Sequence, residues 1–253
     1  MNEWKFVRKG RMPKLKKTVL IEGLPGIGNI GKIAVDFIID ELKAKKIGEF
    51  RSNNMPNSVF INDLDEVELP TIELYHIPTK EKDLLFLSGD LQPLTEESCH
   101  AFCETVLDAF DEDEIITIGG IAKKEEPKTP KVFCTGTEKK YIEQFKKGLN
   151  ISNNAHKNIG PVIGVTGLLI GLAKRRKKKG IMLLSETDAY PLHLGVKGAK
   201  KILNILKQKF KLNIKPSRLN KEVKALQNEL NRITTELTEA GAKEKKEETK
   251  YIG

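Results

Sequence analysis

Residues 18–34 read TVLIEGLPGIGNIGKIA, an apolar run that breaks into a glycine-rich turn and then into a helix-like pattern. This order predicts a strand, a loop and a helix. Glycines in such a loop can adopt positive φ and bring bare backbone N–H groups close to a partner, and the helix that follows begins with a partial positive charge. The loop is therefore interpreted either as an anion-binding site or as a tight turn that packs the strand against the helix.

Two nucleotide-binding fingerprints overlap on this loop, and each is incomplete. The residues GIGNIG from position 26 fit the dinucleotide pattern, and with Lys32 they fit most of a P-loop. A P-loop needs Ser or Thr after the lysine to hold Mg²⁺, but Ile33 stands there. A dinucleotide site needs an acidic residue about 20 positions on, at the end of a second apolar strand. Glu49 instead lies in the polar stretch KKIGEFRSNN, so the packed turn is favoured over a nucleotide site.

Composition indicates one main globular domain with an appendage, because the 253 residues are 39% hydrophobic and 31% charged. No apolar run approaches the roughly 20 residues that cross a bilayer, and the first residues, MNEWKFVRKGRMPK, lack the apolar segment of a signal peptide. We therefore expect a cytoplasmic protein without a membrane partner.

The cysteines and histidines do not form a recognisable metal site. Cys99 and Cys103 stand four apart and share a helix face, without a neighbouring set that completes a zinc site, and Cys134 stands alone. We expect three reduced, packed thiols, no metal and no cofactor.

The net charge of +9 is concentrated in KRRKKK, residues 174–179. This run lies between the apolar segments VTGLLIGLA and GIMLLSE, which favours a solvated connection over a nucleic-acid site. Aromatic residues, which stack on nucleic-acid bases, make up only 6% of the chain. A nucleic-acid partner is therefore not expected.

Short apolar runs alternate with helical patterns along the chain, which predicts an α/β fold: a mainly parallel sheet with helices on both faces. The close succession of strands between residues 58 and 88 predicts a local antiparallel section. Strands are expected at 18–22, 58–62, 71–77, 83–88, 114–119, 131–134 and 181–185, and helices at 30–45, 95–110, 138–149 and 195–210.

An enzymatic pocket in such a fold would lie at the ends of the strands. Asp90 follows one predicted strand, Glu186 and Asp188 follow a second, and the turn Gly119-Gly120 lies at the end of a third. Solvated or helix-capping carboxylates are the commoner case. No catalytic residue is assigned, and we expect a protein that is not an enzyme.

A different pattern begins at the carboxyl-terminal side of Pro216-Ser217, where we divide the chain into a core (1–216), a helix (217–240) and a flexible charged tail (241–253). The helix has a heptad seam that needs a partner, which is the core itself, another copy or another protein. The seam consists of Leu219, Val223, Leu226, Leu230, Ile233 and Leu237.

Four stretches, in their order along the chain, carry a family resemblance: IEGLPGIGNIGKIAVDFI from Ile21, the strand end Gly119-Gly120, GPVIGVTGLLIGLA from Gly160, and LLSET from Leu183. With them, residues 18–219 resemble the proteasome assembly chaperone 2 family, especially its single-domain archaeal members. The resemblance implies a core similar to the nucleoside phosphorylase fold, self-assembly into oligomers, and assembly or engagement of proteasome particles. It also accounts for the incomplete nucleotide fingerprints.

Some relatives in this family end in a hydrophobic residue, a tyrosine and one final residue, a motif that docks between proteasome α-subunits. This chain departs from that motif, because Lys250 precedes Tyr251, and Ile252 and Gly253 follow. We still take Tyr251, Ile252 and Gly253 as the partner-binding candidates.

The sequence thus predicts a homo-oligomeric proteasome assembly chaperone or proteasome-associated adaptor that binds proteasome α-subunits, with a second assembly chaperone as a further candidate partner. One alternative is a nucleoside- or nucleotide-handling enzyme that uses the glycine-rich loop. The other is an oligomeric scaffold whose heptad helix recruits an unrelated partner.

Overall fold

The computed structural model describes residues 4–62, 64–190 and 193–219. The chain divides into two compact units, residues 1–214 and residues 215–253. The sheet and helices described below belong to the first unit. Among the described residues, no helix is long and apolar enough to span a bilayer.

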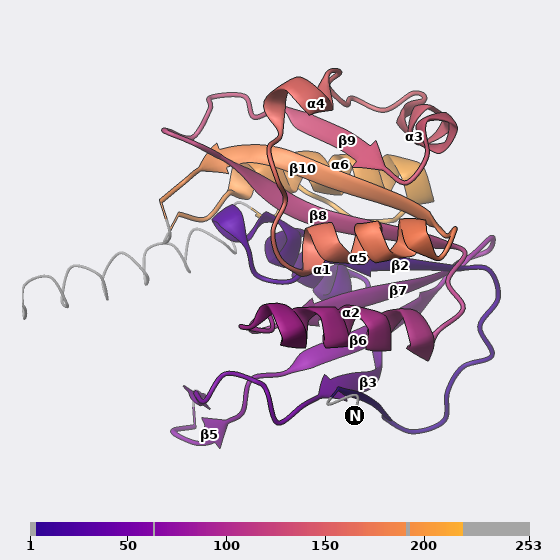
Figure 1. Cartoon of the computed structure of the whole chain (residues 1–253), viewed down its shortest axis with the longest axis vertical. Helices are drawn as coiled ribbons and strands as arrows, with labels where there is room; N and C mark the ends of the chain where they lie inside the picture. The colour runs from indigo at the N-terminus through magenta and orange to yellow at the C-terminus, as the bar shows by residue number, and fades with distance from the viewer. Residues whose placement is uncertain (1–3, 63, 191–192, 220–253) are drawn as a thin grey trace, which may run out of the picture. The chain divides into compact units, whose positions relative to one another are not determined.

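An eight-stranded sheet runs through the first unit in the order β1-β3-β6-β7-β2-β8-β10-β9 (Figure 1). A separate two-stranded hairpin is formed by β4 (Phe60–Ile61) and β5 (Val67–Glu68). The strands of the large sheet are β1 (Lys5–Arg8), β2 (Thr18–Glu22), β3 (Lys45–Arg51), β6 (Ile72–Pro78), β7 (Asp83–Gly89), β8 (Glu114–Lys123), β9 (Val132–Gly136) and β10 (Lys179–Asp188).

The centre of the large sheet is parallel and its two sides are antiparallel. Strands β7, β2, β8 and β10 are parallel neighbours. The antiparallel pairs are β6 with β7, β3 with β6, β1 with β3, and β9 with β10. Five strands, β3 and the parallel four, therefore point the same way. The predicted α/β class with a mainly parallel sheet is confirmed, and the predicted antiparallel section includes β6 and β7.

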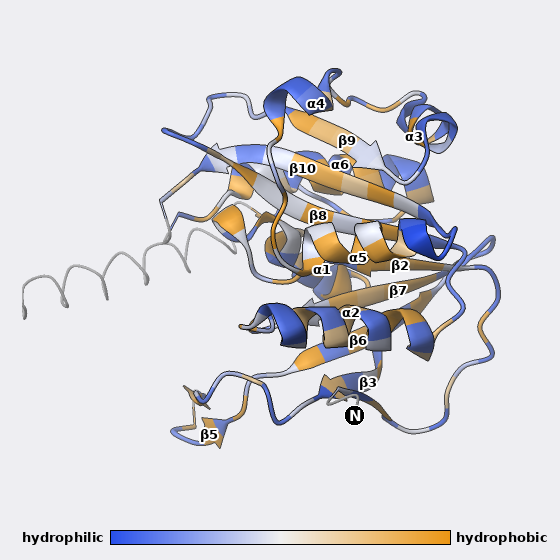
Figure 2. Ribbon diagram, in the orientation of Figure 1, coloured by the Kyte–Doolittle hydropathy of each residue, from blue (hydrophilic) through white to orange (hydrophobic). Residues whose placement is uncertain are grey.

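Helices cover both faces of the sheet (Figure 1). On one face α2 (Glu96–Ala109) packs beside α5 (Val165–Arg175), and on the other α1 (Ile30–Glu41) packs beside α6 (Val196–Phe210). The short helices α3 (Lys139–Lys146) and α4 (Ala155–Asn158) contact β9. Figure 2 shows apolar central strands and helices that alternate between apolar and polar surface.

The glycine-rich stretch forms the predicted strand, loop and helix. Every residue of β2 is buried, which explains its unbroken apolar run, because a strand covered on both faces has no solvent side. Leu20 packs in the core beneath α2 and α5 with Leu85, Phe102 and Leu169. The loop after β2 contains a short 3-10 turn, η1 (Ile27–Asn29), which leads directly into α1.

The largest departure from the predicted elements is β3. The helix predicted to run to residue 45 ends at Glu41, and Lys43 adopts a left-handed φ of 51°. The stretch interpreted as polar then forms β3, in which Ile47 and Phe50 are buried. The register with β6 shifts between Lys46 and Gly48. This irregularity breaks the period-two alternation that would have identified a strand.

Other differences are smaller. The segment VTGLLIGLA, which was not assigned to an element, lies in α5, and the four-residue β1 was not predicted. The strand predicted at 58–62 is reduced to β4, outside the large sheet. Strands β8 and β10 are each 10 residues long and extend beyond their predicted ends.

Candidate functional site

Glycines of the β2–α1 loop permit an unusually close approach of backbone segments. A Cβ on Gly23 would lie 2.4 Å from the carbonyl oxygen of Gly31, and one on Gly31 would lie 2.5 Å from that of Ile118. A Cβ on Gly120 would lie 2.2 Å from the carbonyl oxygen of Ile27. Such distances exclude a side chain without movement of the backbone, so these glycines pack α1 and its loop against β2 and β8.

The loop is also held from the side of β10 and α6. Gly28 has a left-handed φ of 63°, its carbonyl oxygen accepts a hydrogen bond from the backbone N–H of Gly195 at 2.8 Å, and a Cβ there would lie 2.7 Å from Thr187 Oγ1. The lysine that would serve a P-loop is engaged elsewhere, since Lys32 Nζ lies 2.9 Å from Asp36 Oδ2, one turn along α1.

A cavity of about 470 Å³ opens beside this loop, at the ends of β2 and β8. Its lining comes from the glycine-rich loop, from residues 118–122 and from the segment that joins α4 to α5, with Gln92 and Leu184. Gln92 connects these parts: its side-chain amide donates to the carbonyl oxygen of Pro25, and its Oε1 accepts from the backbone N–H of Val165 at 3.0 Å. No described residue in the lining is charged.

A buried carboxylic acid lies at the end of β2, next to the lining residue Leu24. Glu22 is 0% exposed, its Oε1 accepts from the backbone N–H of Leu24 at 2.9 Å, and its Oε2 has no hydrogen bond of ordinary geometry within the described residues. Burial raises the pKa of Glu22 to about 7, and contacts with Leu24, Thr166 and Ile118 lower it only in part. Glu22 therefore titrates near neutral pH.

The carboxylates at the other strand ends stabilise local structure. Asp90 Oδ2 accepts from the backbone N–H and the hydroxyl of Thr71, at 2.9 and 3.0 Å. Glu186 Oε2 accepts from the backbone N–H of Lys131 at 2.9 Å, and Asp188 Oδ1 accepts from that of Tyr190 at 2.9 Å. Each has a structural partner, and none lines the cavity at the glycine-rich loop.

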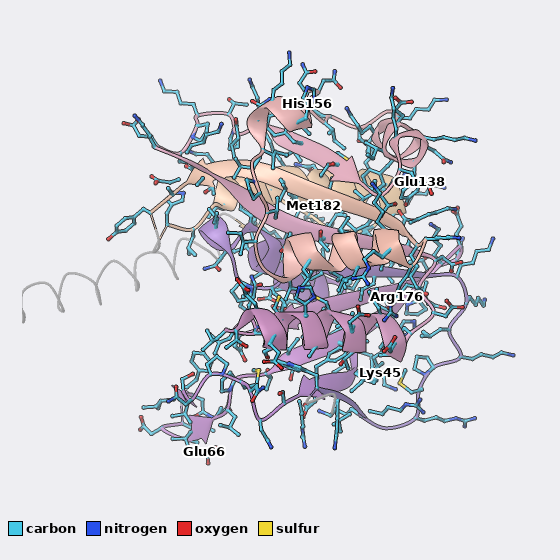
Figure 3. All side chains as sticks on the ribbon, viewed as in Figure 1. Lys45, Glu66, Glu138, His156, Arg176 and Met182 are labelled. Atoms are coloured by element: carbon cyan, nitrogen blue, oxygen red, sulfur yellow. The ribbon has the colours of Figure 1, made fainter. Side chains whose placement is uncertain are left out.

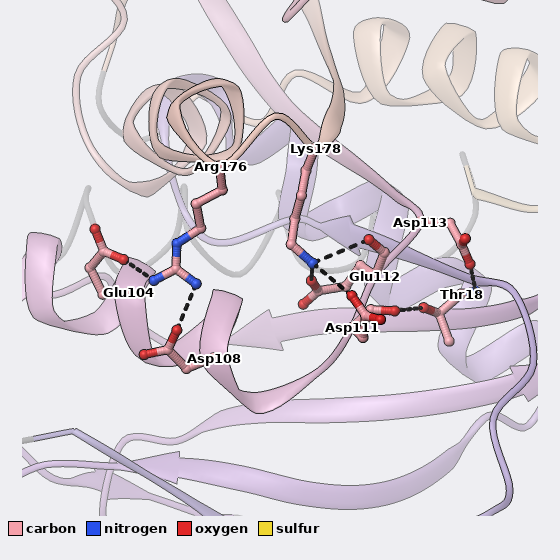
Figure 4. Close-up of polar contacts among 8 residues, drawn as sticks. All are labelled: Thr18, Glu104, Asp108, Asp111, Glu112, Asp113, Arg176 and Lys178. Atoms are coloured by element: carbon pink, nitrogen blue, oxygen red, sulfur yellow. Dashed lines mark hydrogen bonds and ion pairs between the residues drawn. The ribbon is translucent and has the colours of Figure 1, made fainter.

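The basic run 174–179 spans the end of α5 and the first residue of β10, and two of its members are paired within the protein (Figure 4). The Arg176 guanidinium contacts Glu104 and lies 2.6 Å from Asp108. Lys178 Nζ lies 3.1 Å from the buried Glu112 carboxylate. These contacts hold the connection, which was interpreted as solvated, against the end of α2 and the turn that follows it.

All three cysteines are free and buried. The hydrogen bond with Cys99, together with burial, raises the pKa of Cys103, and burial raises the pKa of Cys134 to about 12. Buried thiols of raised pKa react poorly, which agrees with a packing role for Cys103 and Cys134. Within the described ranges, no group of three or more potential ligands could hold a metal ion.

The structure adds a feature that the sequence analysis did not identify, an exposed apolar hairpin. Val59, Ile61, Val67 and Leu69 in and beside β4 and β5 are 54%, 71%, 71% and 74% exposed. The apolar residues of VFIND and EVELP were the available signal, but a strand was predicted at 58–62 and no element was predicted for EVELP.

The candidate partner contacts lie mostly beyond the described residues. Leu219, the first residue of the heptad seam, is 2% exposed. The remaining candidates fall outside the described ranges: Val223, Leu226, Leu230, Ile233, Leu237, Tyr251, Ile252 and Gly253.

Comparison with known proteins identifies relatives across almost the whole chain. The profile of the PAC2 family matches residues 20–234. The crystal structure of Pyrococcus furiosus PbaB, an archaeal proteasome activator, is 32% identical with a TM-score of 0.79, over 92% of this chain and 100% of PbaB. PbaA of the same organism, a homologue of proteasome-assembly chaperone, is 23% identical with a TM-score of 0.72, over 99% of this chain and 100% of PbaA.

A protein of Methanocaldococcus jannaschii described as uncharacterized is 26% identical over 247 residues, which are 94% of this chain and 93% of that protein. The family resemblance seen in the sequence is confirmed by the profile match and by the similarity to PbaB. This chain belongs to the PAC2 family.

Proposed function

We propose that this chain is a cytoplasmic proteasome assembly chaperone or proteasome-associated adaptor that acts as a homo-oligomer and binds proteasome α-subunits. The observation that carries the proposal is the similarity to PbaB, a proteasome activator, at 32% identity over the whole of that chain. A shared α/β fold alone would not support a function, because such folds carry many activities. Sequence identity that extends through the whole chain supports a shared function more strongly than a shared fold does.

The glycine-rich loop supports a binding protein better than a nucleotide enzyme. Its glycines are needed for backbone packing, Lys32 is paired with Asp36, and the neighbouring cavity has no charged lining residue among those described. A phosphate site needs free backbone N–H groups and a cation that can reach the ligand. We therefore propose that the loop is a packing device and that the protein acts without catalysis.

The α-subunit contact that we propose is the carboxyl-terminal Tyr251-Ile252-Gly253. An aromatic ring and an aliphatic side chain can occupy a groove on a partner protein. Each copy of an oligomer would carry one tail, so several weak contacts would combine into strong overall binding. The heptad seam around Leu226 and Leu230 is proposed to contact another copy or a second assembly chaperone.

Affinity capture of the tagged full-length chain from native extract, read by mass spectrometry, tests this function. Proteasome α-subunits should be enriched over a control with an unrelated α/β protein as bait. Recovery of nucleotide-metabolising partners without any proteasome subunit would favour the enzyme alternative. Recovery of a single unrelated protein would favour the scaffold alternative.

A further inference from the structure

The hairpin arm, residues 57–70 with β4 and β5, presents an apolar face to solvent. Ile61 and Val67 are opposite one another in the β4–β5 pair, so their side chains share one face. Val59 and Leu69 stand just outside β4 and β5, two positions from Ile61 and Val67, where continued strand alternation would place them on the same face. These four side chains are all more than half exposed, and Leu64 near the tip is 76% exposed. Monomeric proteins rarely leave such a contiguous apolar face in water.

The arm has a defined conformation although it is only two-stranded. Asn62 Oδ1 accepts hydrogen bonds from the backbone N–H groups of Leu64 and Glu66, at 2.9 and 3.0 Å. Its Nδ2 donates to Glu68 Oε1 at 2.8 Å. An isolated two-stranded hairpin is marginally stable, so these bonds hold the turn in place before any partner arrives. An ordered arm loses less conformational freedom on docking than a flexible one.

The cavity at the glycine-rich loop is also apolar, so it complements the apolar face of the hairpin arm. Its lining is apolar apart from Gln92, Asn158 and Thr166, and apolar residues stand exposed around it: Ile163 is 90% exposed, Ile27 48%, and Leu94, two positions from Gln92, 72%. Six of the eleven large apolar residues that stand exposed in the described ranges lie on the arm, and two more, Ile27 and Ile163, line the cavity. Most of the large apolar side chains that are exposed in the described ranges thus lie at two places.

The charges of the two surfaces are also complementary. Residues 57–70 contain four acidic and no basic residues, in a chain of net charge +9. At the cavity, the lining residue Ala122 is followed by Lys123 and Lys124, and the lining residue Asn158 is preceded by Lys157. Lys123 is paired with Glu186, whereas Lys124 and Lys157 are exposed. An acidic arm with an apolar face can meet an apolar cavity that is flanked in sequence by the exposed Lys124 and Lys157.

The two surfaces of one chain do not meet. No described residue of the hairpin arm lines the cavity, and Figure 3 places Glu66 of the arm and His156 of α4, beside the cavity segment, at opposite ends of the view. We propose that the hairpin arm of one copy docks into the glycine-loop cavity of a second copy, a head-to-tail contact that repeats from copy to copy. This proposal rests on the homo-oligomer proposed above and assigns its contact.

Cysteine cross-linking of the full-length protein tests the contact, because the native cysteines are buried and should not react. Differently tagged Ile61→Cys and Ile163→Cys proteins are mixed and treated with a short bismaleimide. A cross-linked heterodimer is expected. The matched control replaces Ile163→Cys with Lys140→Cys, on the exposed surface of α3, and should give no heterodimer. Cross-linking of Ile61→Cys copies with each other at equal yield would overturn the proposal in favour of a symmetric arm-to-arm contact.

Charge substitution provides a second measurement. Ile61→Asp and Ile163→Asp, both at exposed positions, should each weaken self-association about 100-fold, or about 2.8 kcal/mol at 1.4 kcal/mol per tenfold. Mixed together, they should form one heterodimer of limited size, because one intact arm and one intact cavity remain. An oligomer of unchanged mass in both variants would overturn the docking while the homo-oligomer stands. A monomeric wild-type chain would overturn both the docking and the homo-oligomer. If the oligomer cross-links as expected but does not bind α-subunits, only the proposed function would be overturned.

Discussion

Glu22→Gln should make the protein more stable at alkaline pH while leaving it unchanged at acidic pH. The folded state holds the Glu22 proton up to a pKa of about 7, whereas the unfolded chain releases it near the ordinary value of 4.5. Between these values the folded state binds more protons, so the free energy of unfolding falls as pH rises. The difference of 2.5 units, at about 1.36 kcal/mol each, gives a loss of roughly 3 kcal/mol between about pH 4 and pH 8.

The glutamine variant imitates the protonated acid at every pH and keeps an oxygen that can accept from the backbone N–H of Leu24. Urea denaturation followed by circular dichroism should therefore give an unfolding free energy within about 1 kcal/mol of wild type at pH 5 and a higher one, by up to roughly 3 kcal/mol, at pH 8.5. Differences between variant and wild type cancel the contribution of Glu112, whose pKa burial also raises to about 7.

The matched control is Glu143→Gln on the exposed side of α3, which removes the same charge from solvent and should give equal differences at both pH values. If Glu22→Gln destabilises the protein equally at pH 5 and pH 8.5, the Glu22 carboxylate is charged and compensated in the folded state. The reasoning from burial would then be wrong.

Three further predictions test the packing, the loop and the seam. Gly31→Ala should lower the free energy of unfolding by roughly 1–3 kcal/mol, because its Cβ would meet the Ile118 carbonyl oxygen, whereas Gly171→Ala in α5, with nothing within 4 Å, should raise it by about 0.5–1 kcal/mol. Equal stabilities in urea denaturation would contradict the close packing. ATP, GTP and NAD should show no saturable binding at sub-millimolar concentration by calorimetry, with or without Mg²⁺, and micromolar binding would restore the nucleotide interpretation. Leu226→Asp with Leu230→Asp should reduce the oligomer mass in light scattering with unchanged circular dichroism, since each buried leucine contributes roughly 1.5–3 kcal/mol; an unchanged mass would exclude the seam as an assembly contact.

The strand, loop and helix at residues 18–41 could be predicted because their signals are local. The buried strand is continuously apolar, the glycines mark the turn, and the helix repeats its apolar residues at three- and four-residue intervals. The helix predicted at 95–110 is also local in origin, because α2 begins after Thr95, whose side chain accepts a hydrogen bond from the backbone N–H of Ser98 at 3.1 Å. Each of these elements satisfies its own pattern without help from distant residues.

The cavity and the hairpin arm could not be predicted in this way. The cavity combines Leu24 with Gln92, Gly120 and Ile163, which lie far apart in the sequence and meet only when the parallel strands are ordered. The apolar residues around Phe60 resemble those of a core strand, and they are exposed because, among the described residues, β4 and β5 pair only with each other. Both features depend on the order of the strands in the sheet, and the periodicity of single strands does not predict that order.

The most direct test of the proposed function is the binding of the purified full-length chain to purified proteasome α-subunit rings, measured by surface plasmon resonance. We expect saturable binding that weakens strongly when residues 251–253 are deleted, with the oligomer mass unchanged. If the truncated oligomer binds as tightly as the full-length chain, the contact lies elsewhere on the protein. If the folded, oligomeric full-length chain does not bind α-subunit rings at all, the proposal that this protein binds proteasome α-subunits is wrong.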